Sequence, residues 1–243
     1  MKKLNILNIF LVVLFVTLLA LYIDKIVSYK AWDRYYYGID ISNPEEFPIF
    51  LFEHEFTLTD GSKTSIDQSS LQKVSDLNSY WGSYNELNVN SPEFLPQKLY
   101  LSYTDIRSKK FYGDTITFPK GKMAELFKKA QKNKKLQKLN YTYHNMGLCI
   151  HLGVANEGNI VFWLIGNEWE TELFRTQIRQ KPFPKNLKVR YRPNFNDSTR
   201  DGILDTLFHI YLESLPIEKR SPKLEINANY IDSIPYFFRN FEK

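Results

Sequence analysis

The chain has 243 residues, of which 43% are hydrophobic and 16% aromatic, and its formal net charge is +5. The aromatic content excludes a disordered chain, and the mild positive charge does not indicate a nucleic-acid-binding protein, so we expect no nucleic-acid partner. The single cysteine, Cys149, excludes an intramolecular disulfide.

The first predicted element, residues 4–23, is apolar all round. Fifteen of its residues are Leu, Ile, Val or Phe, and none is charged. A helix of this length spans about 30 Å, the thickness of the hydrocarbon core of a bilayer. The segment therefore predicts that the protein contacts the membrane through a single transmembrane helix, and residues 1–30 are predicted to be an anchor or an uncleaved signal.

A cleaved signal peptide is the alternative for this segment. The small residues that a cleavage site needs are missing around Ala20 and Ala31, which favours an uncleaved signal anchor. Basic residues flank the segment almost equally on both sides, so their count does not decide its orientation. Because a short basic N-terminus usually stays inside, we expect the remainder of the chain on the periplasmic or extracytoplasmic side of the cell membrane.

Residues 31–46 are predicted to be a linker, and residues 47–243 to form one soluble domain. Phe50, Phe52, Phe56 and Leu58 alternate as in a half-buried strand, and the Asp60-Gly61 pair that follows predicts a hairpin turn.

Beyond a polar stretch predicted as a long loop (residues 67–96), two more strands are expected near residues 98–104 and 111–118. A helix is predicted from Pro119 to about Leu139, because apolar residues recur there at helical spacing.

A second hairpin is predicted where residues 148–154 and 160–165 flank an Asn- and Gly-containing turn. The continuous apolar run Ile160 to Ile165 is typical of a strand covered on both faces. Residues 169–181 are ambiguous between strand and helix, and a short strand is expected at 187–191.

Ser198 and Asp201 resemble a capping box that begins a second helix, which Pro216 ends. The aromatic tail after residue 222 is expected to dock onto the domain. The predicted class is therefore α+β, with an N-terminal transmembrane helix followed by mostly antiparallel β hairpins and two covering helices.

The order of four short motifs resembles domain-of-unknown-function family 2931, a group of bacterial envelope and lipoprotein-like proteins. These motifs are Trp81-Gly82, residues 95–99 (LPQKL), residues 110–112 (KFY) and residues 158–166 (GNIVFWLIG). The resemblance implies an exported bacterial protein of unknown activity, with no catalytic residues to carry over. Since this chain lacks a cysteine for lipidation after its apolar segment, the helix is left as the anchor.

The search for a catalytic or metal site finds only weak patterns. Glu53-His54-Glu55 lacks the second histidine of a zinc protease, and His54 is expected to be a structural residue on the apolar face of its strand. Cys149 and His151 share one face of their strand, which is at most half a metal site. We therefore expect no catalytic residues, no metal and no cofactor.

Three glutamates, Glu168, Glu170 and Glu172, would share one face if their stretch is a strand. Such a set could bind a hard cation, although a solvated acidic edge is the commoner explanation.

The predicted helix of residues 120–138 carries eight lysines and one acidic residue, Glu125. Its functional interpretation is contact with anionic lipid or an acidic protein, through a possible interaction surface at Lys128, Lys132 and Lys135. The alternative is an ordinary solvated helix face.

Together these features predict a non-enzymatic, membrane-anchored envelope protein that binds a protein or a ligand. One alternative is an immunity protein that neutralises a secreted toxin. A second alternative is a hydrolase whose catalytic residues the sequence does not reveal.

Overall fold

The computed structural model describes residues 5–44, 47–65, 91–139, 144–184, 200–214 and 239–240. The chain divides into two compact units, Met1–Arg34 and Tyr35–Lys243, which are described separately.

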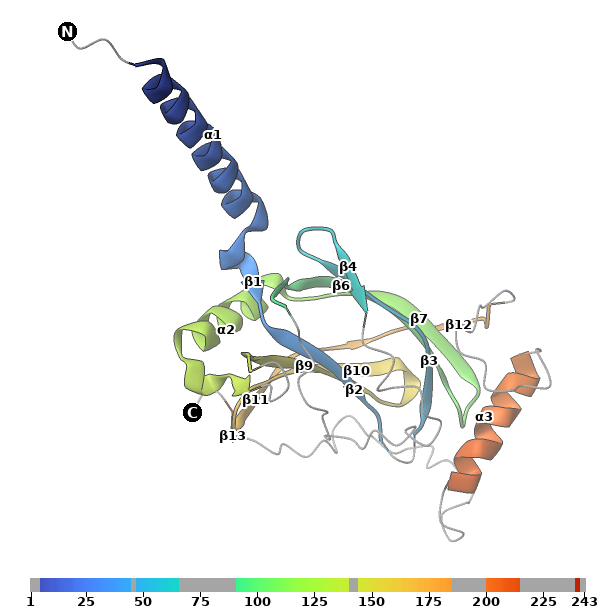
Figure 1. Cartoon of the computed structure of the whole chain (residues 1–243). Coiled ribbons are helices and arrows are strands. Elements are labelled where there is room, and N and C mark those ends of the chain that lie inside the picture. Colours follow the sequence, from blue (N-terminus) through green and yellow to red (C-terminus); the bar gives the residue numbers. More distant parts are fainter. Residues whose placement is uncertain are drawn as a thin grey trace. The chain divides into compact units, whose positions relative to one another are not determined.

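The first unit is built on the helix α1 (Ile6–Tyr29; blue in Figure 1), followed by a single 3-10 turn, η1 (Ala31–Asp33). The Asn5 side chain caps α1 by accepting a hydrogen bond from the Leu7 N–H, 3.3 Å away. None of the residues of α1 is buried, because its apolar side chains face outward all round. The helix is long and apolar enough to cross a membrane.

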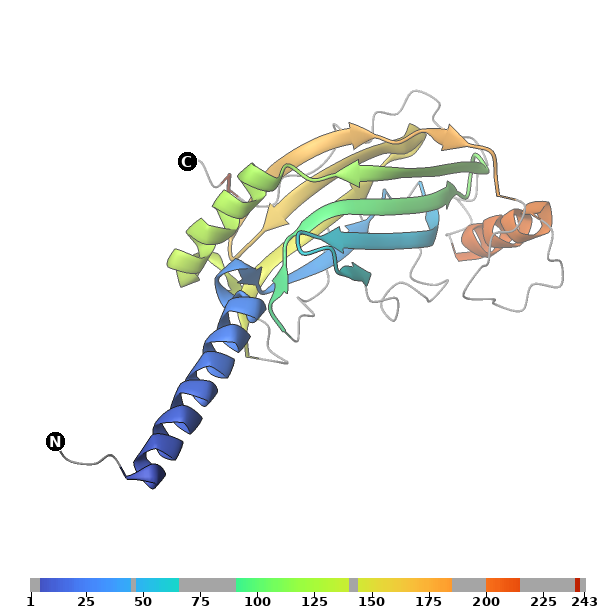
Figure 2. The same ribbon diagram turned by 90° about the horizontal axis from the view of Figure 1, so that it is seen from above.

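The second unit contains two larger β-sheets (Figure 2). One sheet has the strand order β13-β11-β10-β9-β2, with β8 also paired to β9. Its strands are β2 (Tyr37–Ser42), β8 (Lys138–Leu139), β9 (Met146–Val154), β10 (Asn159–Ile165), β11 (Trp169–Gln177) and β13 (Arg239–Asn240). We call this the six-stranded sheet.

The other sheet has the order β12-β7-β6-β3-β4 and is called the five-stranded sheet. Its strands are β3 (Ile49–Leu58), β4 (Lys63–Ser65), β6 (Pro96–Asp105), β7 (Lys110–Thr117) and β12 (Gln180–Lys181). Two short strands, β1 (Arg34–Tyr35) and β5 (Glu93–Phe94), form a separate pair.

Both predicted hairpins are present. The turn at Asp60-Gly61 joins β3 to β4, and Gly61 adopts a positive φ of 85° that a β-carbon would disfavour. The turn η5 (Asn156–Gly158) joins β9 to β10, with Ile160 opposite Val154. Most pairs within the two larger sheets are antiparallel, whereas β2 with β9 and β11 with β13 are parallel.

The two larger sheets pack face to face around an apolar core. Phe118, just after β7, lies with its ring centroid 4.9 Å from that of Phe162 on β10 and 5.6 Å from that of Phe174 on β11. Phe162 and Phe174 stack on each other at 4.6 Å. One aromatic side chain at the end of β7 thus contacts two strands of the opposite sheet.

Residues 31–46 were predicted to be a linker, but the structure places the strand β2 within them. Residues Tyr37 to Ser42 pair in parallel with β9, from Tyr37 opposite Leu148 to Ser42 opposite Gly153. Tyr37 and Ile41 are buried in the core. The second unit therefore begins at Tyr35, well before residue 47, because the chain enters the six-stranded sheet almost as soon as it leaves the first unit.

The lysine-rich helix α2 (Lys120–Lys132) begins after Pro119, as predicted, but it is shorter than expected. It ends at Asn133, whose backbone is extended and whose side chain accepts a hydrogen bond from the Lys135 N–H at 3.3 Å. A 3-10 turn, η4 (Lys134–Leu136), and β8 follow. Lys135 is therefore on a separate turn and not on the helix that carries Lys128 and Lys132.

A second helix, α3 (Arg200–Ser214), agrees with the helix predicted between Ser198 and Pro216. The α+β class with one apolar N-terminal helix is confirmed. The ambiguous stretch after residue 169 is a strand, β11. The loop predicted at residues 67–96 is corrected at its end, where β5 occupies Glu93–Phe94 and β6 begins at Pro96. Residues 67–90 of that loop and the strand predicted at residues 187–191 lie outside the described residues, as do the capping residue Ser198 and most of the aromatic tail.

The strand β10 is covered on both faces, as its apolar sequence predicted. Phe162 and Leu164 point into the core between the sheets, whereas Val161 and Trp163 lie on the opposite face of the sheet and are also buried. Only 4% of the Trp163 surface is exposed.

We expect Trp163→Ala to lower the free energy of unfolding by about 3–5 kcal/mol, because it removes a large buried side chain. This loss is a large part of the roughly 5–15 kcal/mol that stabilises a typical domain. Denaturant unfolding followed by circular dichroism measures it. The matched control is Trp32→Ala, since Trp32 is 56% exposed and lies in the first unit. Unchanged unfolding of Trp163→Ala would show that this side chain contributes little to the core.

Candidate functional site

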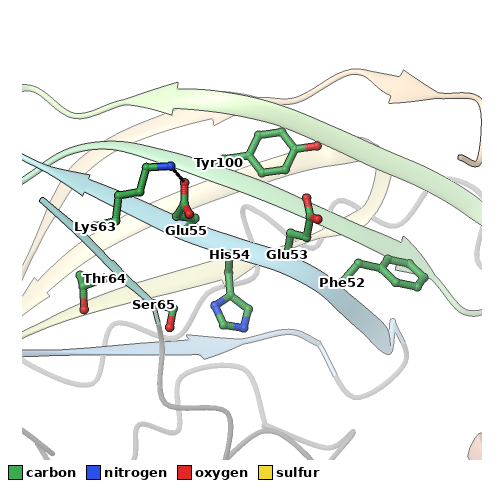
Figure 3. A pocket seen from close by; sticks show the side chains of 8 residues that line it. All are labelled: Phe52, Glu53, His54, Glu55, Lys63, Thr64, Ser65 and Tyr100. Carbon is green, nitrogen blue, oxygen red and sulfur yellow. Dashed lines mark hydrogen bonds and ion pairs between the residues drawn. The ribbon is translucent and has the colours of Figure 1, made fainter. Parts of the chain in front are cut away.

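A surface pocket of about 300 Å³ lies where β4 ends beside β3 (Figure 3). Its lining comes from three neighbouring strands of the five-stranded sheet. The residues are Phe52, Glu53, His54 and Glu55 from β3, Lys63, Thr64 and Ser65 from β4, and Tyr100 from β6. Strand pairing assembles this lining, because Glu55 lies opposite both Ser65 and Tyr100.

The open side of the pocket is polar and charged. The Lys63 ammonium lies 2.6 Å from a carboxylate oxygen of Glu55, and both side chains are at least half exposed. Solvent screens such a pair, which contributes at most about 1 kcal/mol. The pKa of Tyr100 is raised by partial desolvation and by the negative charges of Glu53 and Asp114. These groups can bind a polar or charged ligand group.

His54 lies on the opposite side of β3 from Glu53 and Glu55, because side chains alternate along a strand (Figure 3). It is buried, in agreement with a structural role. Sequence reasoning considered Glu53-His54-Glu55 only as a metal motif and missed Lys63 and Tyr100, whose proximity depends on strand pairing.

The strongest chemical constellation is a buried polar cluster of Asp40, Ser42 and His151. Ser42 Oγ lies 2.7 Å from His151 Nε2, at hydrogen-bonding distance. Asp40 Oδ2 lies 3.5 Å from His151 Nδ1. The register positions these groups, since Asp40 of β2 lies directly opposite His151 of β9. The Trp163 ring, opposite His151 on β10, lies 5.6 Å from the imidazole between ring centroids.

The order of this cluster is the serine, histidine and carboxylate order of many hydrolases. Catalysis also requires that the serine oxygen reach a substrate carbonyl. Ser42 has no exposed surface and His151 is 1% exposed, so neither side chain is open to a substrate in this structure. The hydrogen bond between Ser42 and His151 Nε2 gives these two polar groups a partner on a buried sheet face.

Sequence reasoning missed Asp40 and Ser42 because their segment was predicted to be a linker. A signal was present: Tyr37, Ile39 and Ile41 alternate with Gly38, Asp40 and Ser42, which is the pattern of a strand.

Cys149 and His151 do share one face of β9, as predicted, and both are buried. Desolvation raises the pKa of the Cys149 thiol, and Asp40 raises it further, so the thiolate that a metal requires is disfavoured. No group of three potential metal-binding side chains occurs within the described ranges.

The three glutamates do not form the predicted set. Glu170 and Glu172 share a face of β11, but Glu168 precedes the strand in a left-handed conformation. Glu170 is buried, and Glu172 forms an ion pair with Arg175 at 2.9 Å. The prediction of a shared acidic face is therefore wrong for Glu168, because the strand begins only at Trp169.

The predicted interaction surface consists of Lys128 and Lys132 on α2 and Lys135 on η4, and all three are exposed. We call these three residues the lysine surface. The opposite face of α2 packs into the core through Met123, Phe127 and Ala130.

Comparison with known proteins identifies one family. The model of the family described as "Protein of unknown function (DUF2931)" matches residues 35–201, which begins at the first residue of the second unit. Neither a curated protein nor a solved structure matches the chain.

We expect the polar cluster to stabilise the domain. His151→Ala should lower the free energy of unfolding by about 2–4 kcal/mol, because it leaves a cavity and buried groups without their hydrogen bond. Ser42→Ala removes one hydrogen bond and should cost about 1 kcal/mol. Denaturant unfolding of the full chain measures both. A Ser42→Ala variant that kept its stability but lost a measurable esterase activity would instead indicate catalysis.

The buried thiol gives a further prediction. Native protein should not react with a thiol reagent such as Ellman's reagent at neutral pH, because Cys149 is 2% exposed and its pKa is raised. Unfolding in denaturant should make the thiol fully reactive. Rapid reaction of the native chain would contradict the burial of this face of β9.

Proposed function

The chain belongs to this family of proteins of unknown function, and we propose that it is a non-enzymatic, membrane-anchored envelope protein whose domain binds a protein or a ligand. The observation that carries the proposal is α1. Its residues from Ile6 to Ile23 include no charged side chain, and its apolar side chains are exposed. Exposing this apolar surface to water costs free energy, whereas the hydrocarbon core of a bilayer accommodates it.

The polar groups of α1 also agree with a membrane-spanning helix. The hydroxyl of Thr17 donates a hydrogen bond to the Val13 carbonyl at 2.9 Å, which satisfies the hydroxyl within the helix. Tyr29 and Trp32 are exposed near the end of the helix, where aromatic side chains favour the membrane interface. The Arg34 guanidinium lies 4.6 Å from the centre of the Tyr29 ring. These residues support an interface at the end of α1.

Lys2 and Lys3 precede α1. Basic residues that flank a membrane-spanning helix are usually retained in the cytoplasm, which supports placing the domain on the extracytoplasmic side. Protease treatment of spheroplasts tests this orientation, since the domain should be digested without lysis.

Binding is favoured over catalysis by the two constellations within the described ranges. The pocket of Figure 3 is open and is lined by charged and polar groups that suit a binding site. The polar cluster has the order of a hydrolase triad but is inaccessible. A hydrolase is the second candidate function, because Ser42, His151 and Asp40 follow the order of a catalytic triad. This function would require a conformational change that exposes Ser42 to a substrate. If the bound protein is a secreted toxin, the protein would function as an immunity protein.

We expect the full-length chain to remain with the membrane during carbonate and high-salt extraction, because apolar insertion is not screened by salt. A variant with Leu14→Arg and Leu18→Arg should be extracted, since each arginine near the helix centre costs about 2.5–3.5 kcal/mol of insertion free energy.

The control introduces two arginines at exposed positions of the domain, Gln177→Arg and Gln180→Arg. This variant should remain with the membrane as the unchanged chain does. Release of the unchanged chain by salt alone would contradict the anchor. A mature N-terminus beyond residue 20 would show signal cleavage.

A further inference from the structure

The helix α2 is divided into an apolar face and a basic face. Its apolar face, Met123, Phe127 and Ala130, is almost completely buried. At 100° per residue, Lys128 and Lys132 lie on the opposite, exposed face. Lys134 and Lys135 on the next turn are also exposed, and Glu125 is the single acidic residue between positions 120 and 138. The exposed side of this segment is therefore strongly positive.

The buried face of α2 packs against Tyr35 and Tyr37, where the chain enters the domain. The Phe127 ring contacts the rings of Tyr35 and Tyr37, with centroids 5.3 and 5.8 Å away. The Lys122 ammonium donates hydrogen bonds to the backbone carbonyls of Glu172 and Leu173 at 2.9 and 3.1 Å. These contacts hold α2 on the domain next to Tyr35, so its exposed lysines are presented from a rigid element.

The connection between α1 and Tyr35 is short. Only residues 30–34 separate Tyr29, the end of α1, from Tyr35. Six residues of fully extended chain span at most about 20 Å, whatever the arrangement of the two units. The part of the domain that contacts α2 is therefore tethered close to the end of the anchor.

We propose that the lysine surface binds the anionic headgroups of the membrane in which α1 is anchored, an inference that rests on the proposed membrane anchoring. Ammonium groups attract the phosphates of anionic lipids, and long lysine side chains reach a headgroup layer without burial of the helix backbone. Lys30 and Arg34 outweigh Asp33 on the connection and leave a net positive charge beside the anchor.

The tether favours a lipid partner over an acidic protein. A membrane held by α1 is always within reach of the connection, which gives its headgroups a high effective concentration around the domain. Weak contacts by several lysines therefore suffice to hold this face of α2 on the bilayer. The consequence is a domain with one orientation on an anionic membrane and with its other faces free for a partner.

The test compares the reactivity of individual lysines in the full chain. The protein is reconstituted in nanodiscs of phosphatidylcholine alone or mixed with phosphatidylglycerol, and lysine acylation rates are measured by mass spectrometry. In the anionic discs Lys128, Lys132 and Lys135 should each react about five-fold more slowly, as expected for one headgroup contact per lysine. High salt should restore their rates, and Lys110 and Lys181 should react equally in both discs.

A pair of triple variants supplies the matched control. Lys128→Glu, Lys132→Glu and Lys135→Glu together should abolish the protection of the remaining Lys134. The same change of charge at Lys110, Arg179 and Lys181 should leave the lysine surface protected. Lys110 begins β7, Lys181 lies on its partner strand β12, and Arg179 directly precedes β12, whereas α2 follows the other end of β7.

The outcomes separate this inference from the anchor itself. If the chain enters both kinds of nanodisc but the lysine surface reacts equally in both, lipid binding is overturned and the anchor stands. Protection by an added acidic protein but not by lipid overturns it as well. If the chain enters neither disc, the anchor fails and the inference fails with it. Unchanged thermal unfolding of each variant confirms that the domain remains folded.

Discussion

The apolar layer between the two larger sheets is the interaction on which the rest of the domain depends. Phe118 spans it by contacting Phe162 and Phe174, so the end of the five-stranded sheet is packed against two strands of the six-stranded sheet. Because only Pro119 separates Phe118 from α2, the same layer also holds the first turn of this helix against the domain. The buried face of α2 then continues the core through Met123 and Phe127. The position of the basic residues on the outside of the helix is thus a consequence of what its inside must bury.

A second constraint follows from burial on both faces of the six-stranded sheet. Polar groups on a buried face must find partners within the protein, since an unsatisfied group costs about 1–3 kcal/mol. His151 meets this requirement through Ser42 and lies beside Asp40, both supplied by the neighbouring strand β2. An arrangement with the residue order of catalytic machinery is thus buried within the sheet in this structure, and exposure is the property that sets it apart from an open active site. The charged pocket of Figure 3 lies on the other sheet, where its groups are hydrated.

The strand β2 lies close in the chain to the first unit and is also part of the six-stranded sheet. It belongs to the first segment of the domain, yet it pairs with β9, which lies more than a hundred residues later in the chain. Tyr35 and Tyr37 then hold this segment against Phe127 of α2. A force transmitted through the anchor therefore acts directly on the six-stranded sheet and on α2. The helix that carries Lys128 and Lys132 therefore packs against the segment that receives the chain from the first unit.

The sequence by itself determined the apolar helix, the two hairpins, the burial of Trp163 and the start of α2, because each depends on residues that are neighbours in the chain. Local periodicity and turn residues are sufficient for such elements. The alternation in residues 37–42 was a local strand signal, but only the tertiary structure decided which strand this segment pairs with, since a parallel pairing with β9 leaves no local turn signal. For the same reason it alone brought Asp40 and Ser42 to His151, and Lys63 and Tyr100 to Glu55. These sites depend on the register between distant strands, which is set by the packing of the whole core.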